Sequence, residues 1–378
     1  MRMVFDYSAR AGKCVSVLAL SDQCSRCNRY TSTYSDGCSM TRLLAVTGFS
    51  TLLSLASSSA LADNTQYPLT LNNCGVEVTF EQAPERAIGL GQASAEIMLM
   101  LGLEDRMVGT AFWPNQVLPQ LAEANAKVEV LTVEFPTFES ILAKNPDLVT
   151  AALPSLIGPS SRVATREDFD NVGVATYLSP NTCVAEDAAK DKFGYGSREQ
   201  RWSMDGLYQE IDEMARIFDV DARGQALIED LKQREAVLRA ETPEDSDPLS
   251  FVFWFSSPSP SADAYLGGKN GASGFIADVL GGTNAIDSDA EWPALGWESI
   301  IAADPDVIVV ARVDRNRWDL DNSEAKIEFL NSDPATREMR AVKNGAIVVM
   351  DGHAMDPTMR TIFGAEEVAE QLEALGLR

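Results

Sequence analysis

The stretch FESILAKNPDLV at residues 138–149 recurs as WESIIAADPDVI at residues 297–308, with six positions identical. Each copy predicts a short amphipathic helix that ends before a proline, because proline cannot donate an intrahelical hydrogen bond, and an apolar strand follows. The offset of 159 residues exceeds the period of a solenoid and suits two α/β lobes. The repeat therefore predicts two similar lobes, with Glu139 and Glu298 at equivalent surface positions. A chance match within ordinary α/β patterning is the alternative.

The first 62 residues are predicted to lie outside the fold. A basic start at residues 40–42 precedes an apolar run and the small residues Ala60-Leu61-Ala62, which is the order of a secretory signal peptide. We expect a cleaved signal peptide at residues 40–62 and, at residues 1–39, an upstream extension from a misassigned start. No later run approaches the ~18 apolar residues of a membrane span, and no cysteine at the cleavage site offers a lipid anchor. The expected location is the periplasm of a Gram-negative bacterium.

The cysteines divide between the upstream segment and the expected mature chain. Cys24 and Cys27 have C-x-x-C spacing, but without a second such pair or a His pair nearby a zinc site is not expected. Cys74 and Cys183 remain after the expected cleavage. In an oxidising compartment they predict a disulfide that ties the first strand to a distant loop of the same lobe. Two buried free thiols are the alternative.

Charge excludes one class of partner. Without residues 1–62 the chain holds 25 basic and 53 acidic side chains, a formal charge of −28. A phosphate backbone requires a concentration of Lys and Arg, so no nucleic-acid partner is expected. The remaining 316 residues suffice for two hydrophobic cores.

Hydrophobic periodicity predicts the βαβ order of a parallel sheet twice, after an initial hairpin at residues 67–80. Strands are expected at residues 87–90, 107–110, 148–151 and 175–178 in the first series, and at 251–255, 307–311 and 346–350 in the second. Further helices are expected at residues 94–101, 166–171, 274–280, 325–331 and 361–375.

Two helices, at residues 204–218 and 222–241, separate the two series, and the second would be ~30 Å long. We therefore expect an N-terminal α/β lobe at residues 63–203, a helical segment with the linking helix at residues 204–248, and a C-terminal α/β lobe at residues 249–378. A single helix fixed to both lobes allows only a small rocking movement, so a pre-formed cleft between the lobes is expected.

Signatures of enzymes are mostly absent, and no catalytic residue, metal ligand or cofactor is expected. The chain has one histidine, His353, whereas a zinc site usually takes two or three. A Ser-His-Asp triad would have to use His353 as its base. Residues 89–94 read GLGQAS, which lacks the third glycine of a dinucleotide fingerprint, so a tight strand-to-helix turn is preferred. That turn places Gln92 at the carboxyl edge of the sheet, where open α/β folds bind ligands.

Aromatic and arginine side chains lie at or just after the carboxyl ends of several predicted strands. Large aromatic rings with arginines suit a flat or bulky ligand that carries anionic or carbonyl oxygens. Each aromatic taken alone is more often part of a core, and it is their repeated position that indicates a binding site. The residues in such positions are Phe112, Trp113, Trp254, Phe255, Arg312, Arg315, Arg317, Trp318, His353 and Met355.

From about Asn73 to its end, the chain resembles the periplasmic receptors of ABC importers for iron-siderophores, haem and cobalamin. The resemblance is carried by the run PERAI at residues 84–88, by both copies of the repeat, by Trp292-Pro293 and by the long linking helix. It implies the class III fold of periplasmic binding proteins, in which two Rossmann-like lobes with central parallel sheets are joined by one long α-helix.

The resemblance also implies roles for particular residues. Glu139 and Glu298 would dock onto arginines of the permease dimer in the inner membrane. Trp292 would lie on the ligand cleft, and Arg162, in the loop after the strand at 148–151, would grip siderophore oxygens. The complete set of expected ligand-binding residues is Gln92, Trp113, Arg162, Trp254, Trp292, Arg312, Arg315 and His353.

The expected function is that of a monomeric, non-enzymatic receptor that captures a ferric siderophore and delivers it to an ABC permease. A receptor for cobalamin or another metal chelate is the first alternative. A secreted α/β enzyme that uses Gln92, Arg312 and His353 in the same cleft is the second. Haem is less favoured, because the chain has one His and no visible Tyr-His pairing. The sequence does not distinguish among hydroxamate, catecholate and carboxylate siderophores.

Overall fold

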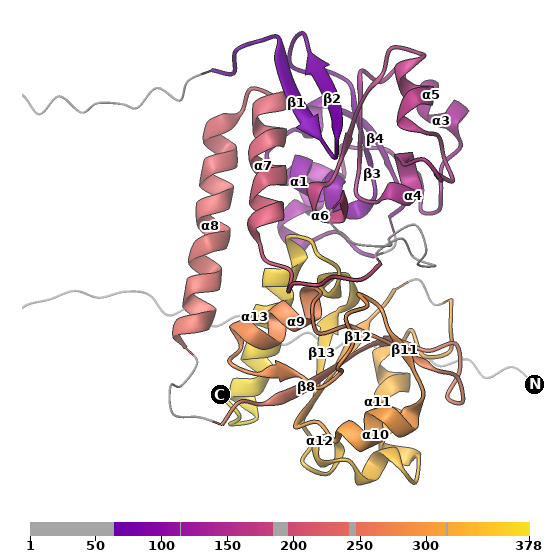
Figure 1. The fold of residues 1–378 in the computed structure, drawn as a ribbon, viewed down its shortest axis with the longest axis vertical. Coiled ribbons are helices and arrows are strands. Elements are labelled where there is room, and N and C mark those ends of the chain that lie inside the picture. The colour runs from indigo at the N-terminus through magenta and orange to yellow at the C-terminus, as the bar shows by residue number, and fades with distance from the viewer. Residues whose placement is uncertain (1–63, 114, 184–195, 242–246, 315–316) are drawn as a thin grey trace, which may run out of the picture. The chain divides into compact units, whose positions relative to one another are not determined.

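The computed structural model in Figure 1 describes residues 64–113, 115–183, 196–241, 247–314 and 317–378. The expected signal peptide at 40–62 and the expected extension at 1–39 lie outside these residues. None of the helices in the described part of the chain is both long and apolar enough to cross a membrane.

The N-terminal lobe (residues 64–183) begins with the predicted hairpin, in which β1 (Leu69–Asn73) pairs antiparallel with β2 (Val76–Phe80). Its main sheet has the strand order β5-β4-β3-β6-β7, and every pairing in it is parallel. The strands are β3 (Ala87–Leu90), β4 (Met107–Ala111), β5 (Val130–Thr132), β6 (Leu148–Ala151) and β7 (Ala175–Leu178). The short strand β5 was not predicted.

Both faces of this sheet are buried, as is usual for a parallel sheet. Successive side chains of a strand point to opposite faces, so Ala87 joins one hydrophobic core and Ile88 joins the other. The helices of the lobe are α1 (Gln92–Met100), α2 (Ala122–Asn125), α3 (Phe138–Leu142), α4 (Pro154–Ile157), α5 (Arg166–Asp170) and α6 (Pro180–Cys183).

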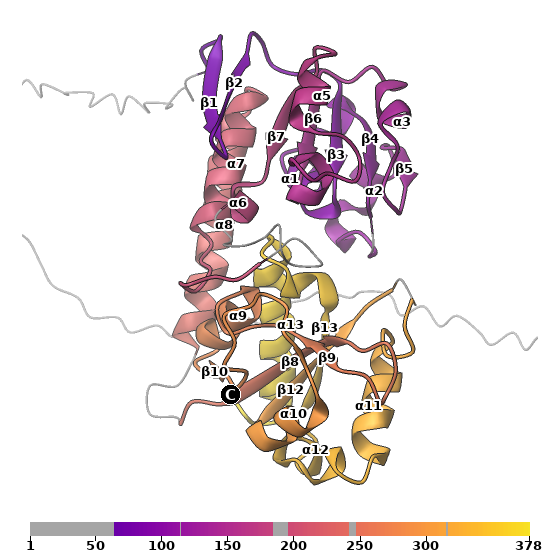
Figure 2. The ribbon, with the colours of Figure 1, turned by 45° about the vertical axis from the view of Figure 1, so that its right-hand side comes forward.

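Two long helices follow the N-terminal lobe in the chain. Helix α7 (Asp205–Ile217) packs along α8 (Asp221–Ala240), as both views of the ribbon show (Figures 1 and 2). Helix α8 also contacts α9 and α13 of the C-terminal lobe. It is therefore the linking helix that the sequence predicts.

The C-terminal lobe (residues 249–378) has a sheet with the order β11-β9-β8-β12-β13, and β10 pairs with β8. Strands β8, β10, β12 and β13 are parallel, whereas β9 and β11 add an antiparallel edge. The strands are β8 (Ser250–Ser256), β9 (Ala264–Leu266), β10 (Thr283–Asn284), β11 (Ala294–Leu295), β12 (Val307–Arg312) and β13 (Ile347–Asp351). The helices are α9 (Ala272–Val279), α10 (Trp297–Ala303), α11 (Ser323–Ser332), α12 (Arg340–Lys343) and α13 (Arg360–Ala374).

The two copies of the repeat occupy equivalent places in the two lobes. The first copy is α3 followed by β6, which pairs with β3, and the second is α10 followed by β12, which pairs with β8. The residue before the proline has a left-handed backbone in both copies, with φ of 48° at Asn145 and 39° at Asp304. Asn and Asp tolerate this conformation better than other residues with a side chain.

The aspartate after each proline joins its strand to the neighbouring strand. Asp147 accepts a hydrogen bond from the backbone N–H of Arg86 at 3.0 Å, and Asp306 accepts one from that of Ser250 at 2.9 Å. These hydrogen bonds explain the identical Asp residues of the repeat. The identical glutamates make no such bond, because Glu139 and Glu298 are exposed and have no hydrogen bond or ion pair with another described residue.

Residues 196–203, which the sequence assigns to the first lobe, bond to the second. Arg198 forms a buried ion pair with Glu291, and the backbone N–H of Trp202 donates to the carbonyl of Asn270 at 2.8 Å. The lobes are thus connected by this segment as well as by α8.

Candidate functional site

A cavity of about 920 Å³ lies between the two lobes. Its walls come mainly from residues at or just after the carboxyl ends of β3, β4, β6 and β7 in one lobe and of β8, β12 and β13 in the other. The volume is near the upper end of the range for small-molecule sites. The cavity therefore has the position predicted for the ligand cleft and room for a large ligand.

The wall from the N-terminal lobe is partly aromatic. The rings of Phe112 and Phe135 lie 4.5 Å apart between centroids, and the guanidinium of Arg162 lies 4.9 Å from the centre of the Phe135 ring. Trp113 also lines the cavity, although it is largely buried. At the start of α1, Gly91 has a φ of 91° and approaches Ala152 so closely that a Cβ would lie 2.7 Å from the Ala152 Cβ. That approach brings the turn before Gln92 to the cavity edge.

The wall from the C-terminal lobe carries two aromatic pairs. Phe255 and Trp292 meet at 4.9 Å with their planes 64° apart, and Tyr265 stacks on Trp318 at 5.2 Å with an angle of 14°. All four side chains line the cavity. Aromatic rings therefore face the cavity from both lobes.

Charged groups in the lining have both signs. Among the described lining residues, the guanidinium groups of Arg162 and Arg317 accompany carboxyl groups from Glu134, Glu210, Asp314 and Asp356. Arg317 forms an ion pair across the cleft with Glu134 at 3.1 Å, and both side chains are more than half exposed. The cavity is therefore not a purely basic site.

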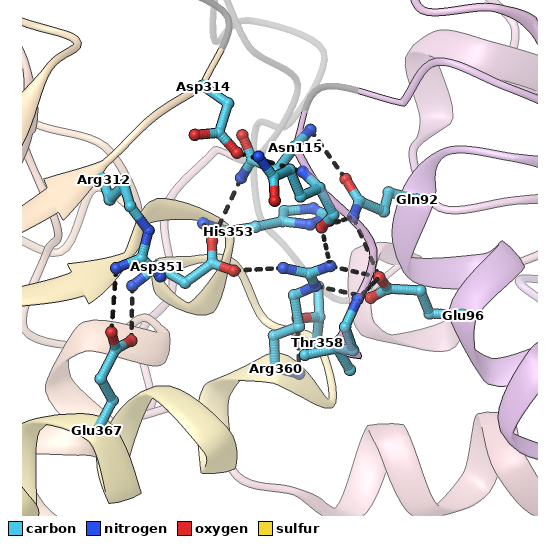
Figure 3. A network of polar contacts seen from close by, with 12 residues as sticks. Gln92, Glu96, Asn115, Arg312, Asp314, Asp351, His353, Thr358, Arg360 and Glu367 are labelled. Carbon is cyan, nitrogen blue, oxygen red and sulfur yellow. Dashed lines mark hydrogen bonds and ion pairs between the residues drawn. The ribbon is translucent and has the colours of Figure 1, made fainter. Parts of the chain in front are cut away.

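A polar cluster joins the lobes beside the cavity (Figure 3). Arg360, at the start of α13, forms ion pairs with Glu96 of α1 and with Asp351 at the end of β13. Its guanidinium also donates to the carbonyl of Gln116 at 2.6 Å, and the side-chain amide of Asn115 donates to Asp351 at 3.3 Å. The C-terminal lobe therefore holds the loop after β4 of the other lobe.

Gln92 lies within this cluster, so its amide is engaged by the protein. The amide nitrogen donates to Glu96 at 3.1 Å and to the Gln116 carbonyl at 3.0 Å, and the amide oxygen accepts from the Asn115 N–H at 3.1 Å. Gln92 is among the residues that line the cavity, and these bonds indicate that it positions the loop at 115–116.

His353 also lines the cavity. Burial lowers the pKa of its imidazole to about 4, and the nearby Arg360 adds to this effect, while Asp351 opposes it. The imidazole is therefore neutral at pH 7. Its Nε2 lies 3.4 Å from Asp356, and its Nδ1 has no hydrogen-bond partner among the described residues.

Five of the eight expected ligand-binding residues line the cavity, namely Gln92, Trp113, Arg162, Trp292 and His353. Trp254 does not, because it is 1 % exposed, packs edge-on against Trp297 and donates its indole N–H to Ser257 at 3.1 Å. Its neighbour Phe255 points to the opposite face and lines the cavity instead.

Arg312 lies outside the cavity lining as well, and its guanidinium pairs with Glu367 at 3.1 Å. The enzyme alternative needs Gln92, Arg312 and His353 in one cleft, and Arg312 does not meet that condition. Arg315 lies outside the described residues.

Several lining residues were not in the predicted set. Phe255 lies near the end of β8, and Arg317 and Trp318 come after β12, so the signal that marked the predicted residues also identifies these three. Phe135 and Tyr265 belong to short edge segments that have no clear periodicity. Glu210 lies on α7 among several other acidic residues, and nothing in the local sequence distinguishes it from them.

The predicted disulfide between Cys74 and Cys183 is present, with a Cα–Cα distance of 5.5 Å. It ties the turn of the β1-β2 hairpin to the end of α6. Among the described residues, no group of three or more His, Cys, Asp or Glu side chains is arranged to hold a metal ion.

Two α/β lobes, a linking helix and a cavity at the carboxyl ends of both sheets define the class III fold of periplasmic binding proteins. The chain belongs to the periplasmic binding protein family, whose sequence profile matches residues 88–354. This membership confirms the family and the fold that the sequence predicts.

Individual relatives are distant but cover most of the chain. An uncharacterized ABC transporter substrate-binding lipoprotein of Bacillus subtilis, YvrC, is 24% identical over 81% of this chain and 86% of its own. A cobalamin-binding protein of Halobacterium salinarum is 22% identical over 75% of this chain and 68% of its own. The crystal structure of an ABC-type Fe3+-hydroxamate transport system from Saccharomonospora viridis is similar with a TM-score of 0.63 and 26% identity, over 81% of this chain and 99% of that chain. These names describe transport or ligand binding rather than catalysis.

Proposed function

We propose that this protein captures a ferric siderophore in the cavity between its lobes and delivers the complex to an ABC permease dimer in the inner membrane. It would act as a monomer in the periplasm, after removal of the signal peptide. The observation that carries the proposal is the cavity itself, which is lined by aromatic rings from both lobes together with Arg162 and Arg317. Rings of this kind stack on the organic part of a chelate, and guanidinium groups donate charge-assisted hydrogen bonds to its oxygens.

The charge of the lining bears on the class of chelate. Four carboxyl groups accompany two guanidinium groups among the described lining residues, and one of these guanidinium groups is paired with Glu134. A trianionic complex would meet repulsion from the carboxylates, whereas a neutral ferric trihydroxamate would not. The similarity to the Fe3+-hydroxamate transport structure supports the same choice.

A cobalamin receptor is the second candidate. The relative from Halobacterium salinarum is named as a cobalamin-binding protein, and a cavity of about 920 Å³ suits a bulky ligand. A cobalamin, like a trihydroxamate, offers many carbonyl oxygens and little negative charge. The metal that the ligand carries, iron or cobalt, distinguishes the two candidates.

Whole-molecule mass spectrometry of the protein purified from an iron-starved host tests the proposal directly. The expected result is a mass increase equal to an iron chelate, and a mass increase equal to a corrinoid would favour the second candidate. A protein that carries neither, and that binds neither ferric trihydroxamate nor cobalamin on addition, would contradict both.

Fluorescence titration then tests the site. Ferric trihydroxamate should quench tryptophan emission, because Trp113, Trp292 and Trp318 line the cavity. Trp292→Ala should weaken binding by about 1–3 kcal/mol through the loss of a stacked ring. Arg312→Ala is the matched control, because Arg312 pairs with Glu367 away from the cavity, and it should leave the dissociation constant unchanged.

A further inference from the structure

Helix α7 brings a carboxyl group to the cavity. Glu210 of α7 lines the cavity together with Leu207, one turn earlier on the same helix, and with Ser179 and Thr182 after β7. The Glu210 side chain is almost completely buried, with 2 % of its surface exposed.

The two oxygens of this carboxyl group are used differently. Oε2 accepts hydrogen bonds from the Ser179 hydroxyl at 2.5 Å and from the Asn181 amide at 3.0 Å. Oε1 has no hydrogen-bond partner among the described residues. A buried carboxylate oxygen without a partner is costly, so a purely structural role leaves it unexplained. Holding Ser179 and Asn181 requires one acceptor oxygen, which a glutamine would also supply.

We propose that Glu210 is a specificity-determining residue of the cavity, and that its Oε1 accepts a charge-assisted hydrogen bond from an ammonium group on a side arm of the bound chelate. This inference rests on the proposed function. In such a complex Arg162 and Arg317 donate hydrogen bonds to the oxygens of the chelate, and Glu210 accepts one from its cationic arm. The ammonium group would supply the partner that the protein does not provide.

The electrostatics of Glu210 agree with this role. Burial raises the pKa of Glu210 to about 7, and the neighbouring Glu213 of the same helix adds to the rise, while the bonds from Ser179 and Asn181 oppose it. From β7, Tyr177 approaches this pair and donates its hydroxyl to Glu213 at 2.7 Å. An adjacent ammonium group favours the ionised carboxylate and would offset the effect of burial. At pH 8 most of the free protein already has Glu210 ionised.

The test compares two probes that differ only at the side arm. Ferric desferrioxamine B is a linear trihydroxamate that ends in a primary amine, and its N-acetylated form lacks the positive charge. At pH 8 the unsubstituted protein should bind the amine form at least about tenfold more tightly, as expected for one charge-assisted hydrogen bond. Equal affinity for both probes would overturn the inference without the use of any variant.

Two variants test whether Glu210 causes the preference for the amine form over the N-acetylated form. Glu210→Gln retains the acceptor oxygen for Ser179 and Asn181, and it should bring the two affinities within about twofold of each other. Glu213→Gln is the matched control, because it removes a carboxylate from the same helix that does not line the cavity, and it should keep the preference. A preference that persists in Glu210→Gln would overturn the inference while the proposed function stands. If neither probe binds the unsubstituted protein, the proposed ferric trihydroxamate function is wrong and the inference falls with it.

Discussion

Arg360 of the C-terminal lobe and Glu96 of the N-terminal lobe form an ion pair that is almost completely buried, with 2 % and 0 % of their side chains exposed. The two residues are 264 positions apart in the chain. Arg360 also forms an ion pair with Asp351, so one guanidinium group pairs with two carboxylates at the junction of the lobes. The lobes are therefore joined by a buried electrostatic contact as well as by α8.

Removal of this guanidinium should destabilise the protein strongly. Arg360→Met leaves two carboxylates without their partner, and we expect the free energy of unfolding to fall by about 3–5 kcal/mol. Urea denaturation followed by circular dichroism measures the change. The control is Lys343→Met, which removes an exposed partner of Glu338 and should cost less than about 1 kcal/mol.

A double-mutant cycle separates the pair from general damage. Glu96→Gln combined with Arg360→Met should be less destabilised than the sum of the single variants, because the buried charge on Glu96 is then absent. Effects that add to within about 0.5 kcal/mol would show that the contact is not energetically coupled.

The Cys74–Cys183 disulfide should be complete in the folded protein. For protein that begins at Asp63, thiol labelling under denaturing but non-reducing conditions should detect no free cysteine. Reduction of the Cys74–Cys183 bond, which spans 109 residues, should lower the free energy of unfolding by about 2–5 kcal/mol, because the denatured chain gains conformational freedom. The Cys74→Ser, Cys183→Ser double variant should match the reduced protein in stability. Two labelled thiols would refute the bond in solution.

Much of the fold follows from sequence pattern. The long parallel strands and the linking helix lie within a few residues of the predicted positions, because each has an apolar run or a helical period with clear ends. The edge strands β9, β10 and β11 have two or three residues each, which is too short for a pattern. β9 and β10 pair with the free edge of β8, and β11 pairs with β9.

The candidate site was predictable only in part. The rule that ligands bind at the carboxyl ends of strands finds the cavity, but it cannot choose between Trp254 and Phe255. These two neighbours point to opposite faces, and the choice depends on where β8 begins its alternation. Arg360 and Glu210 were missed because their partners are distant in sequence or come from another element, and no local pattern marks them.

His353 should make the protein sensitive to acid. The pKa of its imidazole is about 4 in the folded protein and about 6.5 in the unfolded chain, so the unfolded state binds more protons between these values. This group therefore stabilises the fold above pH 6.5, and the contribution is lost as pH falls towards 4. Glu210 acts in the opposite direction, because its pKa is raised, so the two effects partly cancel in the unsubstituted protein.

The difference between the unsubstituted protein and His353→Gln isolates this contribution. The stability of the unsubstituted protein relative to the variant should decline as pH is lowered from 6.5 to 4, measured by urea denaturation at each pH. A difference that does not change with pH would contradict the neutral, buried imidazole.

The last prediction separates ligand capture from delivery. Glu139 and Glu298 stand in the first turns of α3 and α10, at equivalent positions of the repeat, and both are exposed. The aspartates of the repeat hold the neighbouring strands, whereas these glutamates make no hydrogen bond or ion pair with another described residue. Two equivalent carboxylates suit a partner with two related basic sites, as a permease dimer would present.

Reversal of both charges should therefore abolish transport without weakening capture. In Glu139→Arg with Glu298→Arg, like charges would face the permease, at a cost of several kcal/mol, and growth that depends on the siderophore should stop. The dissociation constant of the soluble protein should stay within about twofold, because neither residue lines the cavity. The matched control is Glu167→Arg with Glu324→Arg, which reverses an exposed first-turn glutamate on a different helix of each lobe and should leave transport intact. Normal transport by the first double variant would mean that the glutamates do not dock and that the repeat reflects only the common architecture of the lobes.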